Sequence, residues 1–148
     1  MKSIFLTATA LLSTIALAAP LRAEVAESQS QQVKRLIATR ACYGCNLQGV
    51  NLRGAHLIGA DLRNANLKNA NLEAANLEGA DLQGANLQGA NLTEAFASGT
   101  TFNNANLINA DLSDAQLYNA QVDGAVMIGT DVSGADGLDI TLGVGGEE

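Results

Sequence analysis

An apolar residue recurs at every fifth position through most of this 148-residue chain. The series runs from Leu47 to Val132 and gives 18 five-residue units without an insertion or deletion. In most units, a small residue (usually Ala) lies two positions before the centre and Asn or Asp one position before it, while Gly or Asn lies two positions after it. Leu is the centre of the first ten units, at positions 47, 52, 57, 62, 67, 72, 77, 82, 87 and 92. Any fold of this chain has to satisfy that repeat first.

A period of five matches neither of the regular secondary structures. On an α-helix, successive centres would be rotated by about 140° and would visit every face. On a continuous strand, an odd spacing would place successive centres on opposite faces. A short extended segment followed by a turn does fit, because the centre and the small residue two positions before it then share a face. The Gly or Asn that follows suits the turn, so the sequence predicts a coil with an apolar interior.

The unit A-(D/N)-L-x-x over residues 45–134 resembles the repeat of the pentapeptide-repeat family. That resemblance implies an all-β solenoid, a right-handed quadrilateral β-helix with four units per turn and therefore about 4.5 coils. It also implies a structural or protein-interaction module without enzymatic activity. The closest resemblance is to small exported members such as those of cyanobacteria, with a periplasmic or thylakoid-lumen address.

The first 23 residues have the pattern of a secretory signal peptide. Met1-Lys2 supplies a positive start, an uncharged apolar run covers residues 4–19, and small residues precede two candidate cleavage sites, after Ala23 and, as the alternative, after Ala18. The apolar run is shorter than the roughly 20 residues of a transmembrane helix. The sequence thus predicts export to the periplasm or thylakoid lumen, with secretion as the alternative, and no membrane attachment after cleavage.

Residues 24–44 are predicted to cap the first coil. A short helix is expected over residues 29–41, where apolar side chains fall at helical spacing, at Val33, Leu36, Ile37 and Ala41. The helix would cover the open end of the Leu column, and a helix that docks a partner is the alternative.

A pair of cysteines, Cys42 and Cys45, follows this helix. In an exported protein such a pair is first interpreted as a disulfide, and both residues take inward positions in the repeat. A redox-responsive thiol switch is the alternative. A haem attachment site is excluded because residue 46 is Asn rather than His. A zinc site needs about four ligands, and only His56 could join the two cysteines.

The interior of the coil is predicted to be narrow, because apolar residues are 47% of the chain but aromatic residues only 3%. One departure from the Leu column stands out. Ala97 takes a central position, and the next centre is Phe102. We expect the Phe102 ring to fill volume that is lost at Ala97. Phe96 would then point outward, or the unit 95–99 would be locally distorted.

Residues 135–148 are predicted to end the coil. Apolar residues alternate with others in the pattern of a strand that could close the last coil, at Leu138, Ile140, Leu142 and Val144. The last four residues, Gly145–Glu148, are expected to form a loose tail.

With four units per turn, residues 20 apart lie directly above one another. Asp61 then stacks on Asp81, and Asp111 on Asp131, about 5 Å apart. Two carboxylates this close either raise the pKa of one of them or bind a cation. The alternative is that both stay solvated and interact only weakly. By the same rule Arg53 should lie beside Glu73, as a surface pair.

Three apolar residues near the C-terminal end are expected to share one outer face. Ile108 and Ile128 stack on one another, and Val126 lies on the same face. An exposed patch of this kind indicates a partner site or a weak homodimer. Cover by the 138–144 segment is the alternative.

Charge and composition exclude several classes of function. The net charge is −7, and it becomes −9 after removal of residues 1–23, because Lys2 and Arg22 are lost and no acid is. From residue 69 onward there are 12 acidic residues and no Lys or Arg, which argues against nucleic-acid binding. A single His and the absence of a phosphate-binding Gly loop argue against an enzyme, a metal site or a cofactor.

DNA mimicry is the alternative to a structural or interaction module. Quinolone-resistance members of the pentapeptide-repeat family use an acidic rod to occupy the DNA site of gyrase, and the acidic stretch after residue 68 is similar. Gyrase is cytoplasmic, however, whereas the predicted signal peptide directs export.

Overall fold

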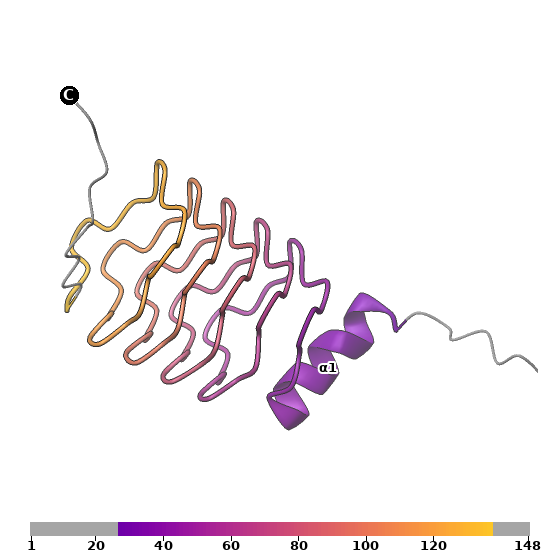
Figure 1. The fold of residues 1–148 in the computed structure, drawn as a ribbon. Coiled ribbons are helices and arrows are strands. Elements are labelled where there is room, and N and C mark those ends of the chain that lie inside the picture. Colours follow the sequence, from indigo (N-terminus) through magenta and orange to yellow (C-terminus); the bar gives the residue numbers. More distant parts are fainter. Residues whose placement is uncertain (1–26, 138–148) are drawn as a thin grey trace, which may run out of the picture.

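The computed structural model describes residues 27–137 (Figure 1). This part of the chain contains one helix, α1 (Gln29–Thr39), followed by a stack of four-sided coils that advance along one axis. The helix lies at one end of the stack, and the described chain ends at the other. The predicted signal peptide at 1–23 and the predicted strand at 138–144 lie outside the described residues.

Parallel bridges hold each coil to the next. Every bridge joins a residue to the one 20 positions later, from Ala41–Asp61 at the first coil to Gln116–Asp136 at the last. Bridges recur every five residues, once on each of the four sides, so four units complete one turn. The prediction of a quadrilateral β-helix is confirmed.

Each unit makes its turn in the same way. In the unit around Leu57, the Leu57 N–H donates to the Asn76 carbonyl of the next coil at 2.7 Å, and the Ala60 N–H closes the turn onto the Leu57 carbonyl at 3.0 Å. The residue two positions after each centre has a left-handed backbone, with φ from 53° to 70° between Gly44 and Gly134. Gly and Asn tolerate this conformation best, which explains their recurrence at that position.

The core is a column of Leu side chains with Ala at its corners. Nearly all the centres from Leu47 to Leu117 are fully buried, and Phe102 is the only aromatic residue among them. Thr100 is the one buried polar residue in the described part of the chain, and its hydroxyl donates to the Leu77 carbonyl at 2.7 Å. At the far end, the centres Val122, Met127 and Val132 are only partly buried.

The sequence of α1 explains both of its ends. Ser28 forms a capping box with Gln31, in which each side chain accepts from the other residue's backbone N–H, at 3.3 and 2.8 Å. Arg40 ends the helix with φ 62°, and its N–H donates to the Leu36 carbonyl at 2.8 Å. The helix therefore stops two residues short of the predicted end at 41, because Ala41 already belongs to the first bridge.

One side of α1 packs on the first coil. Leu36 is fully buried in the same core as the Leu column, and Val33 is partly buried against it. The prediction that Ile37 and Ala41 share this apolar face is wrong, because both are exposed. Ile37 is rotated about 100° from Leu36 on the helix, and Ala41 takes an outward position in the coil.

Candidate functional site

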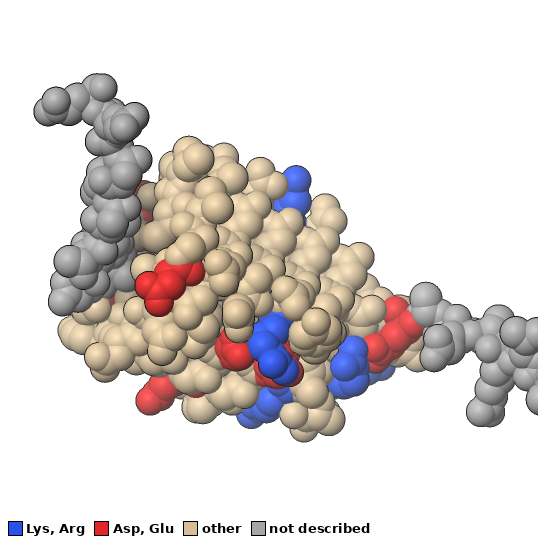
Figure 2. Space-filling model, in the orientation of Figure 1, with Lys and Arg blue, Asp and Glu red and all other residues tan. Residues whose placement is uncertain are grey.

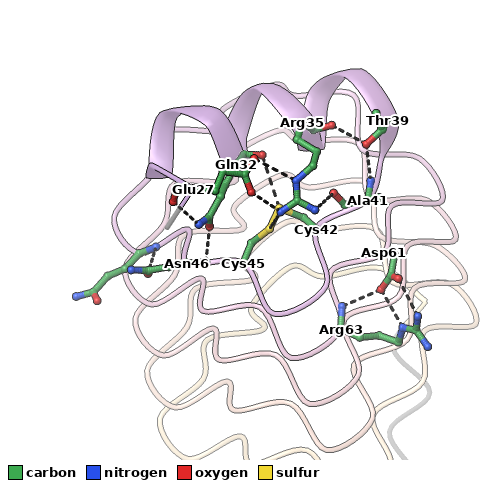
Figure 3. Close-up of a disulfide and its surroundings, with 11 residues drawn as sticks. Glu27, Gln32, Arg35, Thr39, Ala41, Cys42, Cys45, Asn46, Asp61 and Arg63 are labelled. Atoms are coloured by element: carbon green, nitrogen blue, oxygen red, sulfur yellow. Dashed lines mark hydrogen bonds and ion pairs between the residues drawn. A yellow bond between two sulfur atoms is a disulfide. The ribbon is translucent and has the colours of Figure 1, made fainter. Parts of the chain in front are cut away.

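The Cys pair lies where α1 meets the first coil. The Sγ atoms of Cys42 and Cys45 are bonded at 2.04 Å, and both residues are buried beneath the helix (Figure 3). The bond closes a four-residue loop, and Tyr43 projects from that loop with 62% of its surface exposed.

Two side chains of α1 reach across this loop (Figure 3). The Gln32 side-chain carbonyl accepts from the Asn46 N–H at 2.7 Å. Arg35 donates to the Ala41 carbonyl at 3.2 Å and to the Cys45 Sγ at 3.2 Å. The disulfide is therefore shielded from solvent by α1 and these contacts.

Asp61 and Asp81 stack in a bridge, but an arginine sits against them. The Arg63 guanidinium donates to both oxygens of Asp61 at 2.8 Å and lies 3.7 Å from Asp81. The hydrogen bond from Arg63 holds the pKa of Asp61 below its ordinary value. The predicted pair of Arg53 and Glu73 is also present, with Nη2 and Oε1 3.1 Å apart.

Asp111 and Asp131 are bridged in the same manner. The pKa of Asp111 is lowered, first by the Ser113 hydroxyl at 2.6 Å and then by the Ser113 N–H at 2.9 Å. The pKa of Asp131 is lowered mainly by the Ser133 N–H, and this outweighs the repulsion from Asp111. Hydrogen bonds to the ionised form therefore dominate over like-charge stacking at these carboxylates.

The same hydrogen bond explains why Asn or Asp precedes most of the centres. At Asn71, for example, the side-chain oxygen accepts from the Glu73 N–H at 3.0 Å, which fixes the start of the turn. This structural role was not found from the sequence, although the recurrence of Asn and Asp at one position of the repeat was its signal.

The three residues of the proposed apolar patch differ in exposure. Ile128 is 71% exposed and Val126 is 42% exposed, while Ile108 is half-buried. The coil also exposes apolar side chains that the sequence analysis did not group, at Ile58, Phe96 and Tyr118. Their signal was an apolar residue at an outward position of the repeat.

The unit that contains Ala97 has the same inward and outward positions as the other units. Ala97 and Phe102 are both fully buried, and Phe96 is 43% exposed. The backbone bonds of this unit are ordinary, with Phe96 N–H to the Ala75 carbonyl at 2.9 Å and Ala97 N–H to the Gln116 carbonyl at 2.8 Å. Of the two alternatives, Phe96 points outward without distortion of the hydrogen bonding.

A polar groove lies on the side of the coil that carries Tyr43. Its volume is about 370 Å³, and its lining residues are Tyr43, Arg63, Asn64, Gln83, Gly84 and Asn104. The sequence did not indicate this groove, because it forms between four successive coils. Elsewhere, residues 27–137 hold no cluster of three or more His, Cys, Asp or Glu that could bind a metal ion. Over the same range no helix is long and apolar enough to cross a membrane.

The repeat also matches a known family. The family described as pentapeptide repeats matches in eight copies over residues 45–84, 85–121 and 105–136, which together exceed half of the chain. The chain belongs to the pentapeptide-repeat family. The fold that this family shares is the right-handed quadrilateral β-helix.

Solved structures of this family resemble the chain. A pentapeptide repeat protein from the thylakoid lumen of Arabidopsis thaliana is 35% identical with a TM-score of 0.64, over 67% of this chain and 69% of that one. A pentapeptide repeat protein from the cyanobacterium Cyanothece is 30% identical with a TM-score of 0.50, over 73% of this chain and 94% of that one. QnrB1, a plasmid-mediated fluoroquinolone resistance protein, is 24% identical with a TM-score of 0.26, over 64% of this chain and 61% of that one. No curated protein matches the chain in sequence.

Proposed function

We propose that this pentapeptide-repeat protein is a non-enzymatic interaction module of an exported compartment, either the periplasm or the thylakoid lumen. Its rod of about 4.5 coils, closed at one end by α1, would present a partner site formed by Ile108, Val126 and Ile128. We call these three residues the apolar patch. The thylakoid-lumen origin of a similar structure and the signal peptide predicted at residues 1–23 support the compartment.

The observation that carries this proposal is the exposure of Ile128 and Val126, at 71% and 42%, two positions apart in one unit of the coil. Exposed apolar side chains that gather at one place are typical of interaction sites. The coils around the patch carry acidic residues and no Lys or Arg after residue 68. A partner that combines apolar side chains with basic ones would complement this end of the rod.

The test replaces Ile108 and Ile128 together by Ser. Ile58→Ser is the matched control, because Ile58 is 51% exposed on another side of the coil. We expect the double variant to lose partners that the native protein and the control retain in affinity capture from an extract of the exported compartment. Analytical ultracentrifugation of the same three proteins identifies a homodimer. Identical partners and identical mass for all three would contradict the proposal.

The disulfide offers a way to regulate the same module. Arg35 and Gln32 hold α1 over the loop closed by Cys42 and Cys45, so reduction would loosen the loop on which the helix rests. Capture with oxidised and with reduced protein tests this second candidate. A partner gained or lost on reduction supports a redox-responsive module, whereas identical partners indicate a structural disulfide.

A further inference from the structure

The groove next to Tyr43 lies on a different side of the coil from the apolar patch. It spans the units 41–45, 61–65, 81–85 and 101–105, which the bridges stack on one another. We propose that this groove binds an uncharged saccharide. This inference is independent of the partner site proposed above.

One column of turn residues runs along the groove. Asn64, Gly84 and Asn104 occupy equivalent positions in three successive coils, and all three have a left-handed backbone, with φ of 56°, 68° and 57°. A Cβ on Gly84 would collide with the side-chain oxygen of Asn64. The Asn64 carboxamide therefore lies against Gly84, and the backbones of Asn64 and Asn104 are two coils, or about 10 Å, apart.

The polar groups that line the groove can both donate and accept. Asn64, Gln83 and Asn104 each carry a carboxamide, with two N–H donors and a carbonyl acceptor. Asn64 uses one donor on the Tyr43 hydroxyl, at 3.1 Å. Gln83 and Asn104 are exposed. Neighbouring hydroxyl groups of a sugar, which are themselves donors and acceptors, match this set.

One aromatic ring stands at the end of the groove. Tyr43 is 62% exposed, and the Arg63 guanidinium lies 5.6 Å from its ring centroid. The ring is held in place because the disulfide between Cys42 and Cys45 closes the loop on both sides of it. Arg63 stands over the ring, and the part of the ring that it leaves open presents apolar surface to the C–H groups of a sugar.

The charge of the groove argues against an anionic ligand. Arg63 is the one charged residue in the lining, and Asp61 holds it through two hydrogen bonds of 2.8 Å. Asp81 lies 3.7 Å from the same guanidinium. Two carboxylates against one guanidinium leave no excess of positive charge for a carboxylate or phosphate ligand.

The backbone around the groove argues against a peptide strand. The N–H groups of Asn64, Gly84 and Asn104 donate to carbonyls of the next coil, at 2.9, 2.9 and 2.8 Å. An extended peptide binds a sheet by pairing with free backbone groups, and these are already engaged. Recognition in this groove therefore depends on side chains.

The test follows backbone and side-chain amide signals by two-dimensional NMR while the protein is titrated with a neutral tetrasaccharide. Three are used separately: maltotetraose, cellotetraose and N-acetylated chitotetraose. We expect at least one to shift the signals of Tyr43, Asn64, Gln83 and Asn104 at millimolar concentration or below. Tetragalacturonic acid tests an anionic sugar, and tetraglycine tests a peptide. The proposal is overturned if no neutral tetrasaccharide shifts these signals, or if either of the other probes shifts them more strongly.

Variants with matched controls locate the site. Tyr43→Ala and Asn104→Gly should each weaken binding about tenfold, the loss expected for one good contact. Tyr118→Ala and Asn109→Gly are the controls, since Tyr118 is similarly exposed at 51% and Asn109 has a comparable φ of 55° outside the groove. Equal affinity for variants and controls, all shown to be folded by their amide spectra, would place any binding elsewhere.

Discussion

The residue two positions after each core centre determines how sharply the chain turns. Its φ lies between 53° and 70° in every described unit from Gly44 to Gly134. Most of these positions hold Gly or Asn, which adopt left-handed backbone at low cost. Ala74 and Glu94 adopt the same conformation, with φ of 53° and 59°. At these two positions the coils on either side impose a conformation that the residue itself disfavours.

Replacing Ala74 by Gly should therefore stabilise the protein. A left-handed backbone costs a residue with a Cβ about 1–2 kcal/mol, and the greater freedom of Gly in the unfolded chain offsets part of this gain. We expect the free energy of unfolding to rise by about 0.5–1 kcal/mol, measured by urea unfolding. Gly79→Ala is the control, since Gly79 has φ 63° and nothing within 4 Å of a new Cβ. It should lose stability, and two shifts in the same direction would contradict the backbone explanation.

Asp111 should make the protein sensitive to acid. Its pKa in the folded protein lies below the ordinary value of 3.8, mainly because the Ser113 hydroxyl donates to the ionised form. A lowered pKa gives stability that is present above pH 3.8 and is lost as the pH falls through the folded pKa. Asp111→Asn keeps the acceptor for the Ser113 N–H but cannot titrate. We expect urea midpoints of the variant to fall less than those of the native protein between about pH 5 and about pH 2, and equal falls would contradict this role.

Two elements depart from the regular repeat, α1 and the unit that contains Ala97. Leu36 belongs to the core at the end of the stack where the first coil begins. Ser28 and Arg40 set the two ends of α1. Inside the stack, Ala97 and Phe102 are buried in consecutive units of one coil. The backbone bonding of the unit that contains Ala97 is that of the other units.

The packing of Ala97 with Phe102 can be tested by a double-mutant cycle. Ala97→Leu alone should cost about 1–3 kcal/mol by overpacking, and Phe102→Leu alone about 1 kcal/mol by leaving a cavity. The double variant restores Leu at both centres, as in the first ten units, so we expect it to be more stable than the sum of the two losses predicts. Urea unfolding of the four proteins gives the coupling energy. Strict additivity would show that Phe102 does not fill the volume lost at Ala97.

At the scale of the whole molecule, each coil is bonded only to the coils next to it. Stability in such a solenoid is close to a sum of neighbour contacts, so its two ends matter more than in a globular domain. Charge differs between the ends as well. All six Lys and Arg of the described chain lie at or before Lys68. On the face in Figure 2 the basic side chains lie in the middle and toward the α1 end, and the charged side chains toward the far end are acidic. A partner that binds the apolar patch would therefore also contact this acidic end of the rod.

The sequence by itself determined the coil. The period of five is a local property, because each five-residue unit contains both its extended segment and its turn. The inward positions of Leu, Ala and Cys follow from the alternation of side chains along a strand. The number of units in a turn followed from the family resemblance rather than from the period. Given four units per turn, the stacking of Asp61 on Asp81 and of Ile108 on Ile128 could be predicted by counting.

The tertiary structure decided what those stacked residues do. The pKa values of Asp61 and Asp111 are lowered because Arg63 and Ser113 lie within hydrogen-bond distance, and no sequence pattern fixes those side-chain positions. The end of α1 depended on where the first coil begins. The groove depended on side chains of four stacked coils, from Tyr43 to Asn104. The distance in space between two residues that are 20 positions apart depends on how the coil closes. The repeat pattern along the sequence does not contain that information.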